Sequence, residues 1–324
     1  MSVSPSWMPH FQKALDKRQR FRVSGHTDIY RLIHDAGDGC PGLFIDVYHG
    51  HARLEAHDAQ WVAQWPQWVA VLKEFCPEIK SILATVRDKK GKTKEVQSIL
   101  GQTPEMVIGY EHGLRFALRL NQADALGTGL FADMRLTRQR VRNVAAGKTV
   151  LNLFAHAGAF GVVAAVGGAR RVDHLDAARK CAPWAALNMA LNGVNPRQHR
   201  FLVEDAMKYL RKIAKKGNVY DMIICDPPAT AIAPGGKRWT TKENLDFYTT
   251  SLVKALSPGG IFVFSTNDRS LSLSVMQQEI HTQIITMGRA VKEITPLLID
   301  TDFPEKKNAS RLRSMRGVWV HLGD

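Results

Sequence analysis

Acidic residues and one glycine follow apolar, strand-like runs in the second half of this sequence. Gly158 comes after the run LNLF, Asp176 after RVDHL, Asp205 after RFLV, and Asp226-Pro-Pro228 after YDMIIC. Carboxylates accept hydrogen bonds from hydroxyl, amine and ring N–H groups. In an open α/β sheet, ligands bind in the crevice beyond the carboxyl ends of the strands. We therefore expect these four groups to line one cleft that binds a nucleoside-like ligand beside a planar substrate.

Gly158 is expected to begin a helix, where backbone N–H groups face an anionic part of a ligand. The segment His156-Ala-Gly-Ala-Phe-Gly161 lacks the GxGxxG pattern with which dinucleotide enzymes bind a pyrophosphate. A ligand with a single carboxylate needs fewer glycines, which favours the methionine end of S-adenosylmethionine. Asp176, 18 residues after Gly158, is placed to accept hydrogen bonds from both ribose hydroxyls, and Asp173 is the alternative.

Asp205 and the segment Asp226-Pro-Pro228 complete the predicted cleft. Asp205 is expected to accept a hydrogen bond from the exocyclic amine of the cofactor's adenine, or alternatively to cap the following helix. The two prolines fix the backbone and remove two N–H donors. Carbonyl groups and the Asp226 carboxylate can then accept hydrogen bonds from the N–H groups of a base and hold its ring flat. A rigid turn that only ends the strand is the alternative.

Alternating strand-like and helix-like segments from about residue 124 position these groups. The expected strands are 148–154, 171–175, 199–203, 220–225, 259–265, 290–299 and 315–321. This alternation predicts a doubly wound, Rossmann-like α/β domain over residues 123–324, with a mainly parallel, seven-stranded sheet. Residues 1–122 are predicted to form a small α+β domain, which contains a basic helix at 9–24 and a helix at 59–75 whose tryptophans face the core.

The composition favours a soluble, cytoplasmic protein with a polyanionic partner. Lys and Arg number 44 against 30 Asp and Glu, which gives a net charge of +14. The basic residues are concentrated in several segments, which favours contact with nucleic acid. The four cysteines show no CxxC pair and no metal-ligand spacing, so we expect neither a disulfide nor a metal site. The sequence predicts no signal peptide and no membrane span.

Taken in order, these segments resemble the motifs of the class I methyltransferases. The likeness is stronger to bacterial 23S ribosomal RNA methyltransferases whose catalytic domain follows a small domain with an EEHG motif. The matching segments, within about residues 27–322, are Tyr110-Glu-His-Gly-Leu-Arg-Phe116, Thr128-Gly-Leu-Phe-Ala-Asp-Met-Arg135, Asn152-Leu-Phe-Ala-His-Ala-Gly158, and Asn188 with Asn192-Gly193. The resemblance implies S-adenosyl-L-methionine as the cofactor, large-subunit ribosomal RNA as the partner, and an RNA-binding role for residues 1–122.

The same resemblance implies that seven residues contact the cofactor: Phe131, Arg135, Asn152, Phe154, Gly158, Asp176 and Asp205. Arg135 has a physical reason for this role, because the methionine carboxylate needs a fixed cation and the guanidinium offers two parallel donors. A salt bridge between the domains is an equal alternative for Arg135. Phe131 packs either against the cofactor or between the domains.

The turn after the fifth strand of the catalytic domain distinguishes members of this family by their target atom. Cytosine C5 is not nucleophilic, so the C5 enzymes need a cysteine thiolate in this turn. This chain has Ser265-Thr266-Asn267 there, and Cys225 is expected to pack inside its own apolar strand. Guanine N7 can attack a sulfonium methyl directly, so its methylation can rest on positioning. The segment Phe264-Ser-Thr-Asn-Asp268 resembles the F-S-N-N-K of the guanine-N7 half of a bifunctional enzyme of this family.

These features predict an RNA methyltransferase that acts on guanine N7, with Asp226, Pro227, Pro228 and Asn267 as its catalytic residues. Asn267 is expected to donate to guanine O6, while Asp226 accepts from N1–H or N2–H. A cytosine-C5 enzyme is one alternative. An adenine-N6 enzyme is another, although Ala229 stands where such enzymes have an aromatic residue that stacks on the base. A third alternative is a non-catalytic RNA-binding assembly factor with the same fold.

Overall fold

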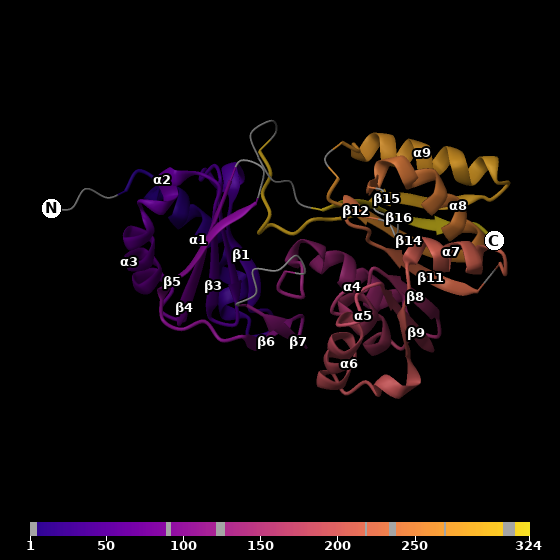
Figure 1. Cartoon of the computed structure of the whole chain (residues 1–324), viewed down its shortest axis with the longest axis horizontal. Helices are drawn as coiled ribbons and strands as arrows, with labels where there is room; N and C mark the ends of the chain where they lie inside the picture. Colours follow the sequence, from indigo (N-terminus) through magenta and orange to yellow (C-terminus); the bar gives the residue numbers. More distant parts are fainter. Residues whose placement is uncertain are drawn as a thin grey trace. The chain divides into compact units, whose positions relative to one another are not determined.

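The computed structural model describes residues 5–88, 92–120, 127–217, 219–232, 238–268, 270–306 and 315–324. The chain forms two compact units (Figure 1). The first comprises Met1–Arg135 and Ile299–Ser314, and the second comprises Leu136–Leu298 and Met315–Asp324. The domain boundary expected at residues 122 and 123 lies outside the described residues. The first unit includes residues 123–135 and 299–314, which the sequence analysis assigned to the catalytic domain.

The first unit is built on a five-stranded sheet of order β1-β2-β3-β4-β5. Its strands are β1 (Ile29–His34), β2 (Leu43–Tyr48), β3 (His51–Ala56), β4 (Ser81–Arg87) and β5 (Thr93–Leu100), and a separate hairpin is formed by β6 (Met106–Glu111) and β7 (Leu114–Arg119). The sequence analysis did not predict β5. This strand is at the edge of the sheet and is largely exposed, so its sequence TKEVQSIL lacks the apolar alternation of a half-buried strand.

Three helices accompany this sheet, namely α1 (Met8–Val23), α2 (Ala59–Val62) and α3 (Trp65–Phe75). The single helix predicted over residues 59–75 is therefore wrong. Pro66 lies in the first turn of α3, where proline is tolerated because those N–H groups have no partner inside the helix. The prediction that the tryptophans face the core is confirmed, since Trp61, Trp65 and Trp68 are all buried.

The segment after residue 298 returns to the first unit through buried arginines. Arg18 donates to the backbone oxygen of Asp302, and Arg135 donates to the carboxylates of both Asp300 and Asp302. The backbone N–H of Arg31 also donates to the Asp302 carboxylate. The partners are between 165 and 284 residues apart in the chain, so no local sequence pattern predicts this arrangement.

The second unit contains a seven-stranded sheet of order β10-β9-β8-β11-β14-β16-β15. The strands are β8 (Thr149–Leu153), β9 (Arg171–Asp176), β10 (Arg200–Val203), β11 (Tyr220–Cys225), β14 (Leu256–Thr266), β15 (Val291–Pro296) and β16 (Arg316–Leu322). Only β16 runs against the others in this sheet. The predicted Rossmann-like fold with a mainly parallel sheet is confirmed. A small hairpin of β12 (Thr230–Ile232) and β13 (Arg238–Thr240) follows β11.

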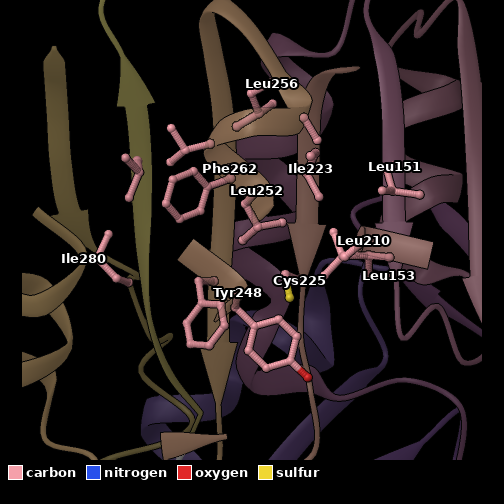
Figure 2. Close-up of a cluster of buried hydrophobic side chains, with 14 of the residues drawn as sticks. Leu151, Leu153, Leu210, Ile223, Cys225, Tyr248, Leu252, Leu256, Phe262 and Ile280 are labelled. Atoms are coloured by element: carbon pink, nitrogen blue, oxygen red, sulfur yellow. The ribbon is translucent and has the colours of Figure 1, made fainter. Parts of the chain in front are cut away.

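Helices connect the strands of the second unit. They are α4 (Arg135–Val144), α5 (Ala159–Val166), α6 (Cys181–Leu191), α7 (Ala206–Ala214), α8 (Leu245–Ala255) and α9 (Leu273–Thr286). Helices α7, α8 and α9 pack in succession and cover an apolar core that includes Leu151, Leu210, Leu252 and Phe262 (Figure 2). Within the described part of the chain, no helix is long and apolar enough to cross a membrane.

Candidate active site

The predicted site residues of the second unit lie along one edge of its sheet. The chain leaves β8 toward β9 on one side and leaves β11 toward β14 on the other, so the strand order reverses between β8 and β11. Gly158 follows β8, Asp176 ends β9, Asp205 follows β10, and Asp226 follows β11. These are all carboxyl ends of parallel strands, and such a reversal is where α/β sheets bind ligands. The topology therefore brings the four groups to the same edge of the sheet. A shared ligand crevice there stays a prediction.

The loop after β8 adopts a conformation that L-residues rarely adopt. The φ angles of Phe154, His156 and Gly158 are 54°, 50° and 79°, and such angles cost a non-glycine residue about 1–2 kcal/mol each. Gly158 cannot be replaced without strain, because a Cβ there would lie 2.5 Å from the Cβ of Ala185. The amide of Asn188 stabilises the loop by donating to the Ala157 oxygen at 2.8 Å. Strain of this kind is concentrated at ligand sites.

The Asp176 carboxylate, at the end of β9, holds the same loop by hydrogen bonds. Its two oxygens accept hydrogen bonds from the backbone N–H groups of His156 at 2.9 Å and Ala178 at 2.8 Å. A carboxylate oxygen can accept more than one bond, so these contacts orient Asp176 without using up its acceptor capacity. The alternative, Asp173, is fully buried in mid-strand and accepts from the Tyr220 hydroxyl at 2.8 Å, which makes it a residue of the interior.

Asn152 and His174 form a buried polar pair beneath this loop. They are partners in the β8–β9 register and are each 2% exposed. Among the described residues, neither the Nδ2 of Asn152 nor either ring nitrogen of His174 has a hydrogen-bond partner. A buried polar group without a hydrogen bond costs about 1–3 kcal/mol. A polar ligand bound at this edge could accept a hydrogen bond from Asn152 and offset that cost. The unpaired Asn152 amide is therefore compatible with the S-adenosylmethionine predicted to bind at this edge.

Acid is expected to destabilise the second unit through His174. Burial lowers the pKa of this histidine to about 3 from the ordinary 6.5. Between these two values the unfolded chain binds a proton that the folded chain excludes, so the free energy of unfolding falls as the pH decreases from 6.5 toward 3. The free energy of unfolding, measured with urea at about pH 7.5 and at about pH 5.5, should fall between these two pH values. This fall should be about 1.4 kcal/mol smaller in His174→Leu than in the native chain. Equal losses in both proteins would contradict the assignment.

Asp205 caps helix α7, as the alternative predicted. Its Oδ1 accepts from the backbone N–H of Lys208 at 2.8 Å, which satisfies one of the N–H groups left open at the helix start. This bond uses one oxygen of the carboxylate. The contact with adenine that the sequence analysis expected stays a prediction, and it would use the other oxygen.

The rim formed by Asp226-Pro-Pro228 is fixed by hydrogen bonds from two neighbouring segments. The Ser265 hydroxyl donates to Asp226 Oδ1 at 2.7 Å, and the Thr241 hydroxyl donates to the Pro228 oxygen at 2.8 Å. The backbone N–H of Ala229 donates to Asn267 Oδ1 at 3.0 Å. With its oxygen turned toward the rim, the exposed Asn267 has its Nδ2 as the remaining donor. Neither Ser265 nor Thr241 was predicted to support the site.

Cys225 ends β11 directly before this rim and is fully buried. Figure 2 shows its sulfur beside the ring of Tyr248, within the apolar core. Burial, together with the neighbouring Asp226 carboxylate, raises the pKa of the Cys225 thiol well above its ordinary value. The thiol therefore stays protonated and lacks the thiolate that a C5 mechanism requires.

The two remaining predicted cofactor residues, Phe131 and Arg135, belong to the first unit. Arg135 is 0% exposed, and its guanidinium donates to Asp300 at 2.9 Å, to Asp302 at 3.1 Å and to the Ile29 oxygen at 2.7 Å. The structure therefore shows Arg135 in an ion pair within the first unit and not in the salt bridge between domains that the sequence analysis left open. Its contact with the cofactor stays a prediction. Phe131 is 51% exposed, and its contact with the cofactor stays a prediction.

Known proteins resemble this chain over most of its length. Residues 92–315 match a family model described as S-adenosylmethionine-dependent methyltransferase. The chain is 30% identical over 276 residues to ribosomal RNA large subunit methyltransferase K of Neisseria meningitidis, covering 81% of the chain and 73% of that protein. It is 34% identical over 334 residues to ribosomal RNA large subunit methyltransferase K/L of Vibrio campbellii, covering 99% of the chain but only 44% of that relative.

Among solved structures, SMU.776, which was crystallised with SAH, superimposes with a TM-score of 0.86 at 25% identity. The match covers 99% of this chain and 83% of that one. The family model matches well over half of the chain, and the Neisseria relative matches most of both lengths. The chain therefore belongs to the family of S-adenosylmethionine-dependent methyltransferases.

Proposed function

We propose that this enzyme methylates N7 of a guanine in large-subunit ribosomal RNA. The relatives from Neisseria meningitidis and Vibrio campbellii are named as large-subunit ribosomal RNA methyltransferases, which supports the class of substrate. The observation that favours guanine N7 is the rim at the ends of β11 and β14. There Asn267 Oδ1 accepts a hydrogen bond from the backbone N–H of Ala229, the residue after Pro228. Cys225, the only cysteine in the described part of this rim, is buried and its thiol stays protonated.

The rim residues are proposed to bind the guanine by its Watson–Crick edge. Asp226 accepts from N1–H or N2–H, the Asn267 Nδ2 donates to O6, and the two prolines keep the backbone rigid around the ring. S-adenosylmethionine supplies an electrophilic methyl group when it is bound. N7 already has a lone pair, so no residue must remove a proton and no covalent intermediate is needed. The chain's contribution is then the fixed position and plane of the base.

The cofactor is proposed to lie along the ends of β8, β9 and β10. The backbone N–H groups that begin α5 and the Asn152 amide face its methionine end. Asp176 accepts from its ribose hydroxyls, and the second oxygen of Asp205 accepts from its adenine amine. The first unit is proposed to bind RNA phosphates, for which α1 offers exposed basic residues such as Lys13 and Lys17.

Nucleoside analysis of methylated ribosomal RNA tests this function. Cells that lack the gene provide unmodified RNA, offered both as protein-free 23S RNA and as large subunits. Incubation with the enzyme and S-adenosylmethionine, followed by digestion and mass spectrometry, should yield 7-methylguanosine. Formation of 5-methylcytidine or N6-methyladenosine would overturn the target atom while retaining the enzyme class. Cofactor binding without any methylated nucleoside in either substrate would favour the non-catalytic alternative.

A further inference from the structure

One buried tyrosine at the candidate site has a hydroxyl that the fold does not satisfy. Tyr248 lies on α8 and is 0% exposed. In the described part of the chain its hydroxyl oxygen has no hydrogen-bond partner. Buried hydroxyl groups in native proteins nearly always have one, and leaving one unpaired costs about 1–3 kcal/mol. Phenylalanine would fill the same space without that cost, so the hydroxyl itself requires an explanation.

The ring of Tyr248 is held in one orientation by aromatic neighbours. Its centroid lies 6.3 Å from that of Phe154, 6.2 Å from that of Trp239 and 5.7 Å from that of Phe264. Phe154 belongs to the strained loop after β8, and Phe264 lies near the end of β14. Two of the aromatic neighbours of Tyr248, Phe154 and Phe264, therefore come from elements that form the candidate site.

The hydroxyl points out of the apolar core and toward the ligand edge of the sheet. Figure 2 shows it directed away from Leu252 and Phe262 and past Cys225, the last residue of β11. The Asp205 carboxylate at the end of β10 is close enough to contribute to the raised pKa of Tyr248, after burial and Cys225. The phenol consequently stays protonated at neutral pH and is available as a hydrogen-bond donor.

We propose that the Tyr248 hydroxyl binds the adenine ring of S-adenosylmethionine, beside Asp205. This inference rests on the proposed function, in which Asp205 accepts from the adenine amine. The remaining edges of adenine present ring nitrogens, which are acceptors without protons, and a phenol is a suitable donor to them. The adenine is favoured over the target base because two site residues near Tyr248, Phe154 and Asp205, are on the proposed cofactor side.

The test compares Tyr248→Phe with a matched control, Tyr30→Phe. Tyr30 is also buried with an unpaired hydroxyl among the described residues, but it lies in the first unit, stacked on Phe21. Calorimetry with S-adenosylmethionine should show a Kd roughly three- to tenfold weaker for Tyr248→Phe, because one hydrogen bond to the ligand is lost. Tyr30→Phe should bind like the native chain. Neither variant should lower the melting temperature.

Two readouts separate this inference from the proposed function. With saturating cofactor, the KM for 23S RNA should be the same in Tyr248→Phe and the native enzyme. A raised KM for 23S RNA with an unchanged Kd for the cofactor would indicate that the hydroxyl contacts the target base, and would overturn the assignment. A native enzyme that binds and methylates, combined with no effect of Tyr248→Phe on the Kd, would refute the inference alone. Failure of the native chain to bind S-adenosylmethionine would refute the function itself.

Discussion

Replacing Asp226 with alanine is expected to slow methyl transfer by about 10²-fold or more while leaving the Kd for S-adenosylmethionine nearly unchanged. In the proposed mechanism no group removes a proton, so the rate depends on how well the guanine is positioned. Asp226 provides the acceptor for the N–H groups of the base, and its orientation is fixed by the Ser265 hydroxyl at 2.7 Å. Single-turnover assays with 23S RNA and calorimetry with the cofactor measure the two quantities separately.

Three other variants define the outcome. Asn267→Ala should behave like Asp226→Ala, because it removes the proposed donor to O6. Ser265→Ala should have a smaller effect on the rate, because it only frees the Asp226 side chain to rotate. Asp176→Ala should instead weaken cofactor binding, since it lies at the end of β9 and orients the loop at His156. If Asp226→Ala and Asn267→Ala both abolish cofactor binding, these two residues bind S-adenosylmethionine, and the proposal that they bind the guanine is wrong.

The positions of the site residues followed from local sequence patterns. The strand predicted at 220–225 is β11 (Tyr220–Cys225), and the strand predicted at 148–154 contains β8 (Thr149–Leu153). Apolar runs and the turns that end them are local signals. Once the strands are parallel, their carboxyl ends share one edge, so Gly158 and Asp226 can be placed on the same edge without any knowledge of long-range contacts.

The bonds that fix those residues were not predictable in the same way. The hydrogen bond from Ser265 to Asp226 joins residues 39 apart in the chain and requires that β11 and β14 be neighbours. The burial of Tyr248 depends on neighbours from separate elements, among them Phe154, Trp239 and Phe264. Periodicity identifies Tyr248 only as a core residue of a helix. Its relation to a ligand emerges from the buried surroundings and not from the helix pattern.

Arg135 shows the limit of a motif interpretation. The resemblance connected Arg135 with the cofactor, but in the structure it joins β1, β6 and the segment that follows β15. Its guanidinium donates to the Ile29 oxygen and to Asp300 and Asp302, and its Nε lies 3.7 Å from the Glu111 carboxylate. Glu111 belongs to the Glu-His-Gly motif of the same resemblance. The two motifs therefore meet in one buried ion-pair network of the first unit.

Arg135→Ala is consequently expected to destabilise the first unit by about 3–5 kcal/mol, because it leaves buried carboxylates without their cation. Asp302 is 0% exposed and Glu111 is 2% exposed, so neither reaches solvent in the folded unit. Urea unfolding followed by tryptophan fluorescence should show a transition at lower urea for this unit, which contains Trp61, Trp65 and Trp68.

The matched control is Glu78→Ala, which removes the partner of Arg22 in an ion pair of the same unit. The Glu78 side chain is 42% exposed, and pairs of this kind contribute only about 0–1 kcal/mol.

The two roles considered for Arg135 give opposite results in one pair of measurements. If Arg135 binds the methionine carboxylate, Arg135→Ala will retain the native unfolding curve and lose affinity for S-adenosylmethionine. If it holds the network together, the unfolding midpoint will fall, and calorimetry at low temperature, where the variant is still folded, will give the native Kd.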